Sequence, residues 1–409
     1  MPLTTSERRL TDTIAAAHES LLRDLTTHVN LPTGGVAAPA MDESLALLTD
    51  RLKRLGAECW SHTGEQPPPW LFAGAAERAS RKVVVCRRSG TGATRMLLSG
   101  HVDTVHEPDS PFRQLAVAPD RKTATGPGCV DMKGGLVIAI AALEALEACG
   151  ISSNWSFVLS TDEETGSFAA DRFLREQAKL HDVGLAFEPA TADGGLVTER
   201  PGSGQFFVEA TGSPAHVGRD FKNGVSAIDA LARAIPPISA LAAPDEGLIV
   251  SVGVINGGTA TNVVPDSAKA WGNLRFATPT QGEKAVAAIE SACRAAAGKA
   301  TLDVRSTLNR PAKPATPGVL TLAGLARAAA EDLGQSLPLS KTGGVCEGNN
   351  LQAEGLPTID TLGVRGGGLH TPQEWIDLSS LVERCQLLAL LMSRLSERSF
   401  QEWSKQNGQ

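Results

Sequence analysis

The sequence predicts an α/β protein: a mixed, largely parallel sheet flanked by helices, with a smaller two-layer α+β domain inserted into it. Three observations support this fold class. Short apolar runs alternate with helical periodicity between residues 82 and 187, which is typical of a parallel sheet. The alternation of predicted strands and helices changes near residue 201, and the segments after the insert return to the first domain. A chain of 409 residues also exceeds what one hydrophobic core usually holds.

The elements of the larger domain follow in order along the chain. Apolar residues at three-to-four spacing predict two N-terminal helices, over residues 10–30 and 41–56. Short apolar runs predict buried strands at residues 82–86, 96–99, 156–160 and 183–187. The segments between these strands predict helices at residues 134–149 and 167–180.

The inserted domain is expected to read strand, helix, strand, strand, helix, strand. Its strands are predicted at residues 206–210, 248–252, 270–276 and 301–305, and its helices at residues 224–235 and 282–298. The predicted organisation is therefore residues 1–201 for the first part of the catalytic domain, 202–312 for the insert and 313–409 for the second part.

Composition narrows the class of protein. A net charge of −7 argues against a nucleic-acid partner, and no apolar run approaches the roughly 20 residues of a membrane helix. The first 30 residues contain no signal-peptide-like apolar stretch, so we expect a cytoplasmic protein. Seven cysteines form no C-x-x-C pair, and reduced, mostly structural thiols are expected at positions 59, 86, 129, 149, 293, 346 and 385.

Groups that bind metals follow the predicted strands. His101 and Asp103 come after one strand, Glu163 and Glu164 after the next, and Glu188 after a third. Open α/β sheets bind ligands at the carboxyl ends of their strands, so these side chains are expected to lie close together.

Two further donors lie in glycine-rich segments. Asp131 precedes a predicted helix and stands between Gly128 and the pair Gly134-Gly135, and His370 follows three glycines. A carboxylate on such a turn can bridge two ions. Two imidazoles and several carboxylates are ligand chemistry for two zinc-like ions that share one carboxylate.

Each signal alone has a simpler interpretation. His101 and Asp103 form an incidental His-x-Asp more often than a site, Asp131 suits a helix N-cap, and adjacent glutamates are usually solvated. In a metal site, however, adjacent acids often divide the work. One binds metal while the other takes a proton from metal-bound water.

Taken in order, the motifs identify a family. His-x-Asp, Gly-Pro-Gly-x-x-Asp-Met-Lys-Gly-Gly, Asp-Glu-Glu-x-Gly-Ser, Glu-Pro and a distant His together resemble the two-zinc aminoacylase/carboxypeptidase family of metallopeptidases. The resemblance covers nearly the whole chain past about residue 80. Within the family, the chain looks most like the glutamate carboxypeptidases of the folate-hydrolysing type.

The resemblance implies a metal-ligand set. Asp131 matches the bridging ligand, His101 and Glu188 match the ligands of one ion, and Glu164 and His370 match those of the other. Zinc is the expected metal, with cobalt or manganese as alternatives.

The same resemblance implies roles beside the metals. Glu163 matches the general acid/base, and Asp103 matches the acid that orients the imidazole of His101. The peptide bond that follows the bridging aspartate is typically cis in the family, so Asp131–Met132 is expected to be cis.

The insert resembles the family's lid and dimerisation domain, which implies a homodimer. His216 matches a histidine that reaches the partner subunit's active site and stabilises the oxyanion. Asn262 matches a substrate-binding asparagine, and Arg310 matches an arginine that grips the substrate's C-terminal carboxylate.

One departure affects specificity. Glutamate-specific relatives carry a lysine about eight residues after the ligand that Glu188 matches, where this chain has Gly195-Leu196. The run from Gly343 to Asn350 also differs from the family pattern, and Cys346 either faces substrate or is a buried, inert thiol.

The expected activity is therefore hydrolysis of an amide in an N-acyl amino acid or short peptide. A hydroxide bridging the two ions would attack with Glu163 as general base, releasing a C-terminal amino acid. An N-acyl amino acid deacylase and a di- or tripeptidase are alternatives on the same frame. A catalytically silent metal-binding protein is a further alternative, although every matched position is intact.

Overall fold

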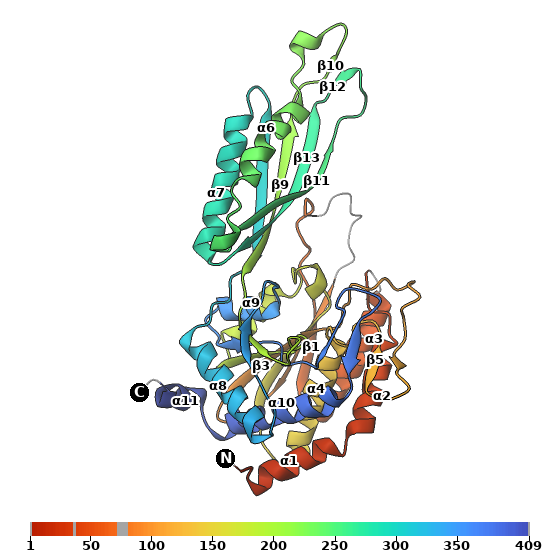
Figure 1. Cartoon of the computed structure of the whole chain (residues 1–409), viewed down its shortest axis with the longest axis vertical. Coiled ribbons are helices and arrows are strands. Elements are labelled where there is room, and N and C mark those ends of the chain that lie inside the picture. The colour runs from red at the N-terminus through yellow and green to blue at the C-terminus, as the bar shows by residue number, and fades with distance from the viewer. Residues whose placement is uncertain (1, 36–37, 72–80, 408–409) are drawn as a thin grey trace.

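The protein consists of a catalytic domain and an elongated domain inserted into it (Figure 1). This computed structural model describes residues 2–35, 38–71 and 81–407. Each domain has its own hydrophobic core. One core gathers residues from Leu10 to Phe400, and the other gathers residues between Phe206 and Ala312. The predicted fold class is confirmed, while the boundaries 201/202 and 312/313 stay predictions.

A six-stranded sheet forms the centre of the catalytic domain. Its order is β1 (Glu58–Thr63), β2 (Lys82–Arg88), β6 (Asn154–Ser160), β3 (Arg95–His101), β7 (Val183–Ala186) and β16 (Thr358–Ile359). The central strand β3 pairs in parallel with both β6 and β7, and β7 pairs in parallel with β16. The pairs β1–β2 and β2–β6 are antiparallel. The sheet is therefore mixed and largely parallel, as predicted.

Alternate residues of these strands face opposite sides of the sheet, because side chains alternate along a strand. Val84 and Met96 belong to the main core, whereas Val83 and Leu97 belong to a small cluster on the other face. Main-core helices are α1 (Thr5–Ala15), α2 (His18–Val29), α3 (Ala38–Arg54), α4 (Lys133–Ala148), α8 (Pro317–Asp332), α10 (Ser379–Glu397) and α11 (Phe400–Asn407). Helices α5 (Asp171–Ala178) and α9 (Glu347–Ala353) contribute to the other cluster.

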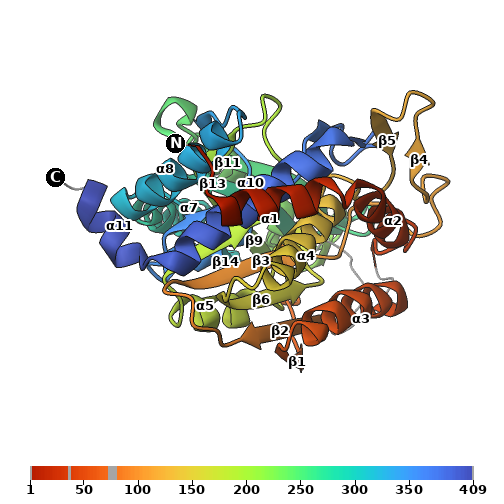
Figure 2. The same ribbon diagram turned by 90° about the horizontal axis from the view of Figure 1, so that it is seen from below.

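The N-terminal region departs from the expected helix over residues 10–30. The chain ends one helix at Ala15 and begins the next at His18. Viewed from below, the two helices differ in direction, with α1 lying along α10 (Figure 2). Helix α1 packs mainly against α10, whereas α2 packs mainly against α4. None of the helices in the described ranges is long and apolar enough to cross a bilayer.

The inserted domain has two layers, as predicted. Its antiparallel sheet has the order β11 (Ile249–Gly257), β13 (Ser267–Phe276), β9 (Gly202–Thr211) and β14 (Thr301–Arg310). Helices α6 (Ala227–Ser239) and α7 (Pro279–Ala296) pack on one face of this sheet. A short ribbon of β10 (Ala215–His216) and β12 (Val263–Val264) lies at the end farthest from the catalytic domain (Figure 1).

Several short strands were not predicted from the sequence. A four-stranded sheet joins β17 (Gly366–Gly367), β18 (Trp375–Asp377), β5 (Thr123–Thr125) and β4 (Ala116–Val117). A parallel pair joins β15 (Leu339–Lys341) to β8 (Leu196–Glu199). The four-stranded sheet matters for function because it brings the loop that carries His370 beside the loop that carries Asp131.

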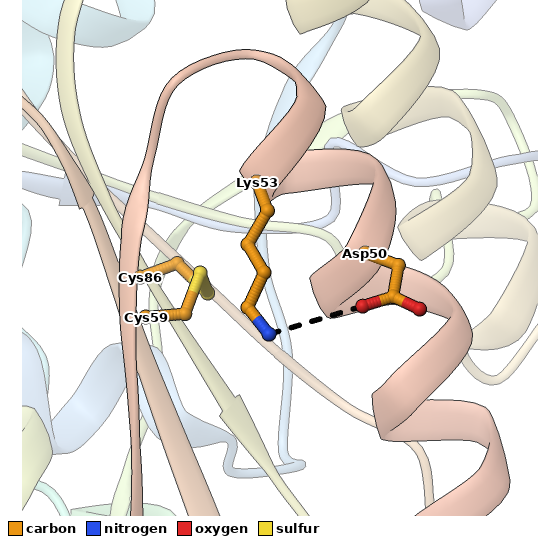
Figure 3. The surroundings of a disulfide bond; sticks show 4 residues. All are labelled: Asp50, Lys53, Cys59 and Cys86. Carbon is orange, nitrogen blue, oxygen red and sulfur yellow. Dashed lines mark ion pairs between the residues drawn. A yellow bond between two sulfur atoms is a disulfide. The ribbon is translucent and has the colours of Figure 1, made fainter.

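The expectation of reduced thiols is wrong for two cysteines. Cys59 of β1 and Cys86 of β2 form a disulfide, near the ion pair between Asp50 and Lys53 of α3 (Figure 3). The two cysteines are direct partners across antiparallel strands, 27 positions apart in the chain. Strand register creates this pairing, and cysteine spacing alone does not reveal it. The other five cysteines are free.

Candidate active site

The ends of three neighbouring strands bring the predicted donors together. His101 is the last residue of β3, and Glu188 follows β7 after one residue. Glu163 and Glu164 lie in a short 3-10 helix, η1 (Glu163–Thr165), just after β6. Because β6, β3 and β7 are parallel neighbours, their carboxyl ends share one edge of the sheet. His101 Nε2 lies 3.9 Å from Glu188 Oε1.

Asp131 lies between the two imidazoles. Its Oδ1 is 3.5 Å from His101 Nε2, and its Oδ2 is 3.5 Å from His370 Nε2. His370 Nε2 is also 3.3 Å from Glu164 Oε2. Each oxygen of one carboxylate therefore faces a different histidine, as a bridging ligand requires. The Asp131–Met132 peptide bond is cis, which confirms the prediction.

The donor set fits divalent metal ions. His101 is 1% exposed, and its Nε2 has no hydrogen-bond partner within the described ranges. Buried polar atoms are normally satisfied, so an orphaned imidazole nitrogen among carboxylates points to a missing partner. Donor atoms of His101, Asp131 and Glu164 lie within 4.8 Å of one another, as do those of His101, Glu163 and Glu188. Nitrogen and carboxylate donors at this spacing suit zinc.

The electrostatics of the cluster also favour a cation. Burial raises the pKa of Glu164 to about 7 and that of Glu188 well above its ordinary value; the charges of Glu163 and Asp131 add to the effect on Glu188. Contact with Asp131 and Glu164 raises the pKa of His370 to about 10. Buried carboxylates this close repel one another, and bound cations would relieve that repulsion.

Asp103 supports the centre in two ways. His101 Nδ1 lies 2.9 Å from the backbone oxygen of Asp103 and 3.4 Å from its carboxylate. The carboxylate accepts hydrogen bonds from the backbone N–H groups of Glu163, at 3.2 Å, and Glu164, at 3.1 Å. Asp103 is buried, so it links the histidine of one strand end to the two glutamates of the next.

Arg310 lies against the predicted general base. Its Nη2 donates to Glu163 Oε1 at 2.6 Å, and its Nη1 donates to Asn350 Oδ1 at 2.7 Å. The residue is 2% exposed, and its Nε has no partner within the part of the chain that the structure describes. The sequence predicted a contact with substrate carboxylate, and in this conformation the guanidinium holds Glu163 instead.

His216 and Asn262 lie on adjacent segments at the β10–β12 ribbon, away from the predicted metal ligands of their own chain. His216 pairs with Val263 in the β10–β12 ribbon, and the backbone oxygen of Asn262 accepts a hydrogen bond from Val217 N–H at 3.0 Å. Both residues are exposed. The ribbon lies at the opposite end of the molecule from β3 (Figure 1).

A cavity of about 830 Å³ adjoins the cluster. The catalytic domain lines it with Asp131, Glu163, Glu164, Glu188 and His370, and the base of the insert lines it with polar side chains that include Ser203, Arg275 and Arg310. Ser203 pairs with Arg275 on one side and with Arg310 on the other, so the three form a row across the sheet. The row faces the cluster of predicted metal ligands across a space large enough for a short peptide.

The two positions where the sequence departs from relatives are both buried. Leu196 lies in the main core, so it leaves no cation at the expected lysine position. Cys346 is buried, and burial raises the pKa of its thiol well above the ordinary value. Its neighbours Gly344 and Val345 line the cavity. The structure therefore favours the interpretation of Cys346 as an inert thiol.

Sequence reasoning missed Glu374, which lies behind Asp131. Its buried carboxylate accepts hydrogen bonds from Gly128 N–H at 2.8 Å, Val130 N–H at 2.9 Å and Asp131 N–H at 3.1 Å. His106 Nε2 lies 2.8 Å from the same side chain. The only sequence signal was that Glu374 follows the predicted ligand His370 by four residues. Acids at such positions are common on protein surfaces.

Comparison with known proteins agrees with this geometry. The sequence pattern of peptidase family M20/M25/M40 matches residues 97–394. Carboxypeptidase G2 of Pseudomonas sp. is 28% identical over 389 residues, covering 92% of this chain and 89% of that protein. Succinyl-diaminopimelate desuccinylase 2 of Shewanella loihica is 27% identical, covering 74% and 85%.

Solved structures show the same fold. A tripeptidase from Staphylococcus aureus superposes with a TM-score of 0.74 at 21% identity, covering 93% of this chain and 99% of that one. The family match spans well over half the chain, and the metal-ligand geometry lies inside the matched region. The chain therefore belongs to peptidase family M20/M25/M40 and is a metal-dependent amidohydrolase.

Proposed function

We propose that the enzyme hydrolyses the amide bond of an N-acyl amino acid or short peptide and releases the C-terminal amino acid. The observation that carries this proposal is the position of Asp131 between His101 and His370, beside a cavity and next to Glu163. Two divalent ions, when bound by His101, Asp131, Glu164, Glu188 and His370, would polarise the amide carbonyl and lower the pKa of a water to about 7.

Glu163 moves the proton in this proposal. Its carboxylate lines the cavity beside the ligands, where it can accept a proton from the attacking water and return it to the leaving amine. Arg310 fixes that carboxylate through the 2.6 Å hydrogen bond to Oε1. Arg310 binds the substrate's free carboxylate, and Asn262 of a second copy of the chain joins it there. Arg310 must then release Glu163 to bind the substrate.

A second copy of the chain completes the site in this proposal. His216 stabilises the oxyanion at the partner's metal centre, and the insert supplies the dimer interface. Two features support this arrangement. The ribbon that carries His216 lies far from its own metal centre, and the edge strand β11 exposes Ile249, Val254 and Ile255. An apolar edge strand is a surface on which another chain can pair.

The alternative functions use the same fold and the same predicted metal ligands. The desuccinylase and tripeptidase similarities favour an N-acyl amino acid deacylase or a tripeptidase as second candidates. We propose zinc as the native metal, with cobalt or manganese able to replace it, and a cytoplasmic location without a nucleic-acid or membrane partner.

Metal removal tests the proposed activity. The purified enzyme is stripped with a chelator, and zinc, manganese or cobalt is restored before assay on N-acyl amino acids, dipeptides, tripeptides and their C-terminal carboxamides. We expect hydrolysis to return with metal and to favour substrates that have a free C-terminal carboxylate. Equal cleavage of the carboxamides would refute the carboxypeptidase assignment. Metal content below one ion per chain, with no amide cleaved, would refute the hydrolase proposal as a whole.

A further inference from the structure

Two buried cations share one buried carboxylate where the insert joins the catalytic domain. Arg200 donates to both oxygens of Asp360, from Nε at 3.0 Å and from Nη2 at 2.7 Å. Lys313 Nζ lies 3.2 Å from Asp360 Oδ2. Arg200 is 7% exposed, and Asp360 and Lys313 are 0% exposed. The cluster therefore buries two positive charges against one negative charge.

Among the residues that the structure describes, neither Arg200 nor Lys313 forms an ion pair with an acid other than Asp360. Cys346 lies close enough to influence Arg200, but burial keeps its thiol protonated by raising the pKa. Glu188 also acts on Arg200, but it belongs to the predicted metal-ligand set. An uncompensated buried charge is costly, so an arrangement that keeps one beside a cavity suggests an anionic ligand.

Arg200 is the member of the cluster that reaches the cavity. It is part of the cavity lining, and its Nη1 has no hydrogen-bond partner among residues 2–35, 38–71 and 81–407. A Cβ atom added to Gly344 would lie 3.5 Å from Nη1, so the glycine leaves this nitrogen uncovered by a side chain. Lys313 is absent from the cavity lining.

The guanidinium is held in one orientation. The backbones of Arg200 and Lys313 exchange two hydrogen bonds of 2.9 Å, one in each direction, at the two crossings between the domains. Asp360 occupies the Nε and Nη2 edge of Arg200. The remaining nitrogen is therefore positioned before any ligand arrives, which lowers the entropic cost of binding.

We propose that Arg200, oriented by Asp360, binds a second carboxylate of the substrate, separate from the α-carboxylate of the released amino acid. This inference rests on the proposed amide hydrolysis and names its substrate class: amides of dicarboxylic acids or of acidic amino acids. The second carboxylate belongs either to the acyl group or to the C-terminal side chain. Arg200 would thereby supply the charge that Leu196 does not.

Matched acid and amide substrates test the subsite. The pairs are N-acetylglutamate with N-acetylglutamine, and N-succinylalanine with N-succinamoylalanine, each measured as kcat/KM on the metal-loaded enzyme. We expect one pair to favour the acid by about 10- to 100-fold, the range of a hydrogen bond to a charged group. The pair that responds shows on which side of the amide the carboxylate lies.

Three variants separate binding from a structural role. Arg200→Gln should bring the acid-to-amide ratio of kcat/KM close to one. Arg200→Lys should give an intermediate ratio, because it keeps the positive charge but loses the planar guanidinium that can donate from two nitrogens. Lys313→Gln is the matched control, since it removes a cation from the same cluster without touching the cavity, and it should retain the ratio. Absence of any acid preference, or an equal loss in Lys313→Gln, would overturn the proposal.

Calorimetric titration makes the test independent of turnover. Succinate, succinamate, glutamate and glutamine are titrated into the metal-loaded protein and into Arg200→Gln, with thermal unfolding as a check of folding. We expect one acid to bind at least about tenfold more tightly than its amide, and only when Arg200 is present. Discrimination without hydrolysis would refute the proposed function and keep the subsite. Hydrolysis without a preference for the acid in either assay would refute the subsite and keep the proposed function.

Discussion

The metal centre and the distal end of the insert hold the predicted catalytic side chains in opposite environments. At the centre, His101 is buried, and hydrogen bonds through Asp103 link it to Glu163 and Glu164. At the distal end, His216 and Asn262 are exposed on a two-stranded ribbon. The side chains of the metal centre are held in place by contacts within their own chain. Those of the distal ribbon can act in catalysis only if a second molecule binds there.

Replacement of Glu163 is expected to have the largest effect on turnover. Glu163→Gln removes the proton acceptor while keeping a hydrogen-bond acceptor for Arg310. A general acid–base group contributes about 10²–10⁴-fold, so kcat should fall by that factor. Metal content, measured by elemental analysis, should stay at the wild-type value. Glu176→Gln, on the exposed side of α5, is a matched control and should leave kcat unchanged. Full activity in Glu163→Gln would exclude its assigned role.

Replacement of His216 tests whether the distal end acts on a second chain. Loss of one oxyanion donor costs about 10²–10³-fold in kcat, and we expect that loss in His216→Ala without any change in metal content. Each variant alone should therefore keep only a small fraction of the wild-type kcat. A mixed dimer of His216→Ala and Glu163→Gln subunits, however, would contain one site with both groups intact.

Co-expression with two different tags allows the mixed dimer to be isolated and assayed. Recovery toward half of the wild-type activity is expected if His216 works in trans. If the mixed species is as inactive as its parents, or if the wild-type protein is monomeric and active, the partner-subunit role is wrong. The exposed distal ribbon would then need another explanation.

The sequence was informative where function depends on strand ends. His101, Glu163 and Glu188 each follow an apolar run, and parallel neighbours bring such ends together whatever the exact packing. Asp131 and the cis bond after it came from a motif in one continuous segment. These features are local in sequence, so pattern and resemblance were sufficient to predict them.

The contacts that the sequence did not reveal join distant segments. Asp360 meets Arg200 from 160 positions away, and Glu374 meets Asp131 from 243 positions away. In the sequence, both acids look like the many others that end up solvated. Only the assembled fold shows that they are buried against cations or amides, which is also why the partners of Arg310 could not be predicted.

Replacement of Glu374 gives the smallest expected effect and tests how much the centre depends on such a contact. Glu374→Gln keeps the shape but weakens the acceptors for the N–H groups of Gly128, Val130 and Asp131. Groups that orient metal ligands typically contribute about 10- to 100-fold in metal affinity. We therefore expect weaker metal binding by that factor in a chelator competition assay, with kcat restored at saturating metal.

Glu383 provides the control for this last experiment. It is an acid of the same C-terminal region that pairs with Arg365 and is absent from the cavity lining. Glu383→Gln should leave metal affinity unchanged, and thermal unfolding of the metal-free proteins separates loss of stability from loss of affinity. If Glu374→Gln binds metal as tightly as Glu383→Gln does, the loop around Asp131 holds its shape without the carboxylate. The order at the metal centre would then come from the ligands and the metals themselves.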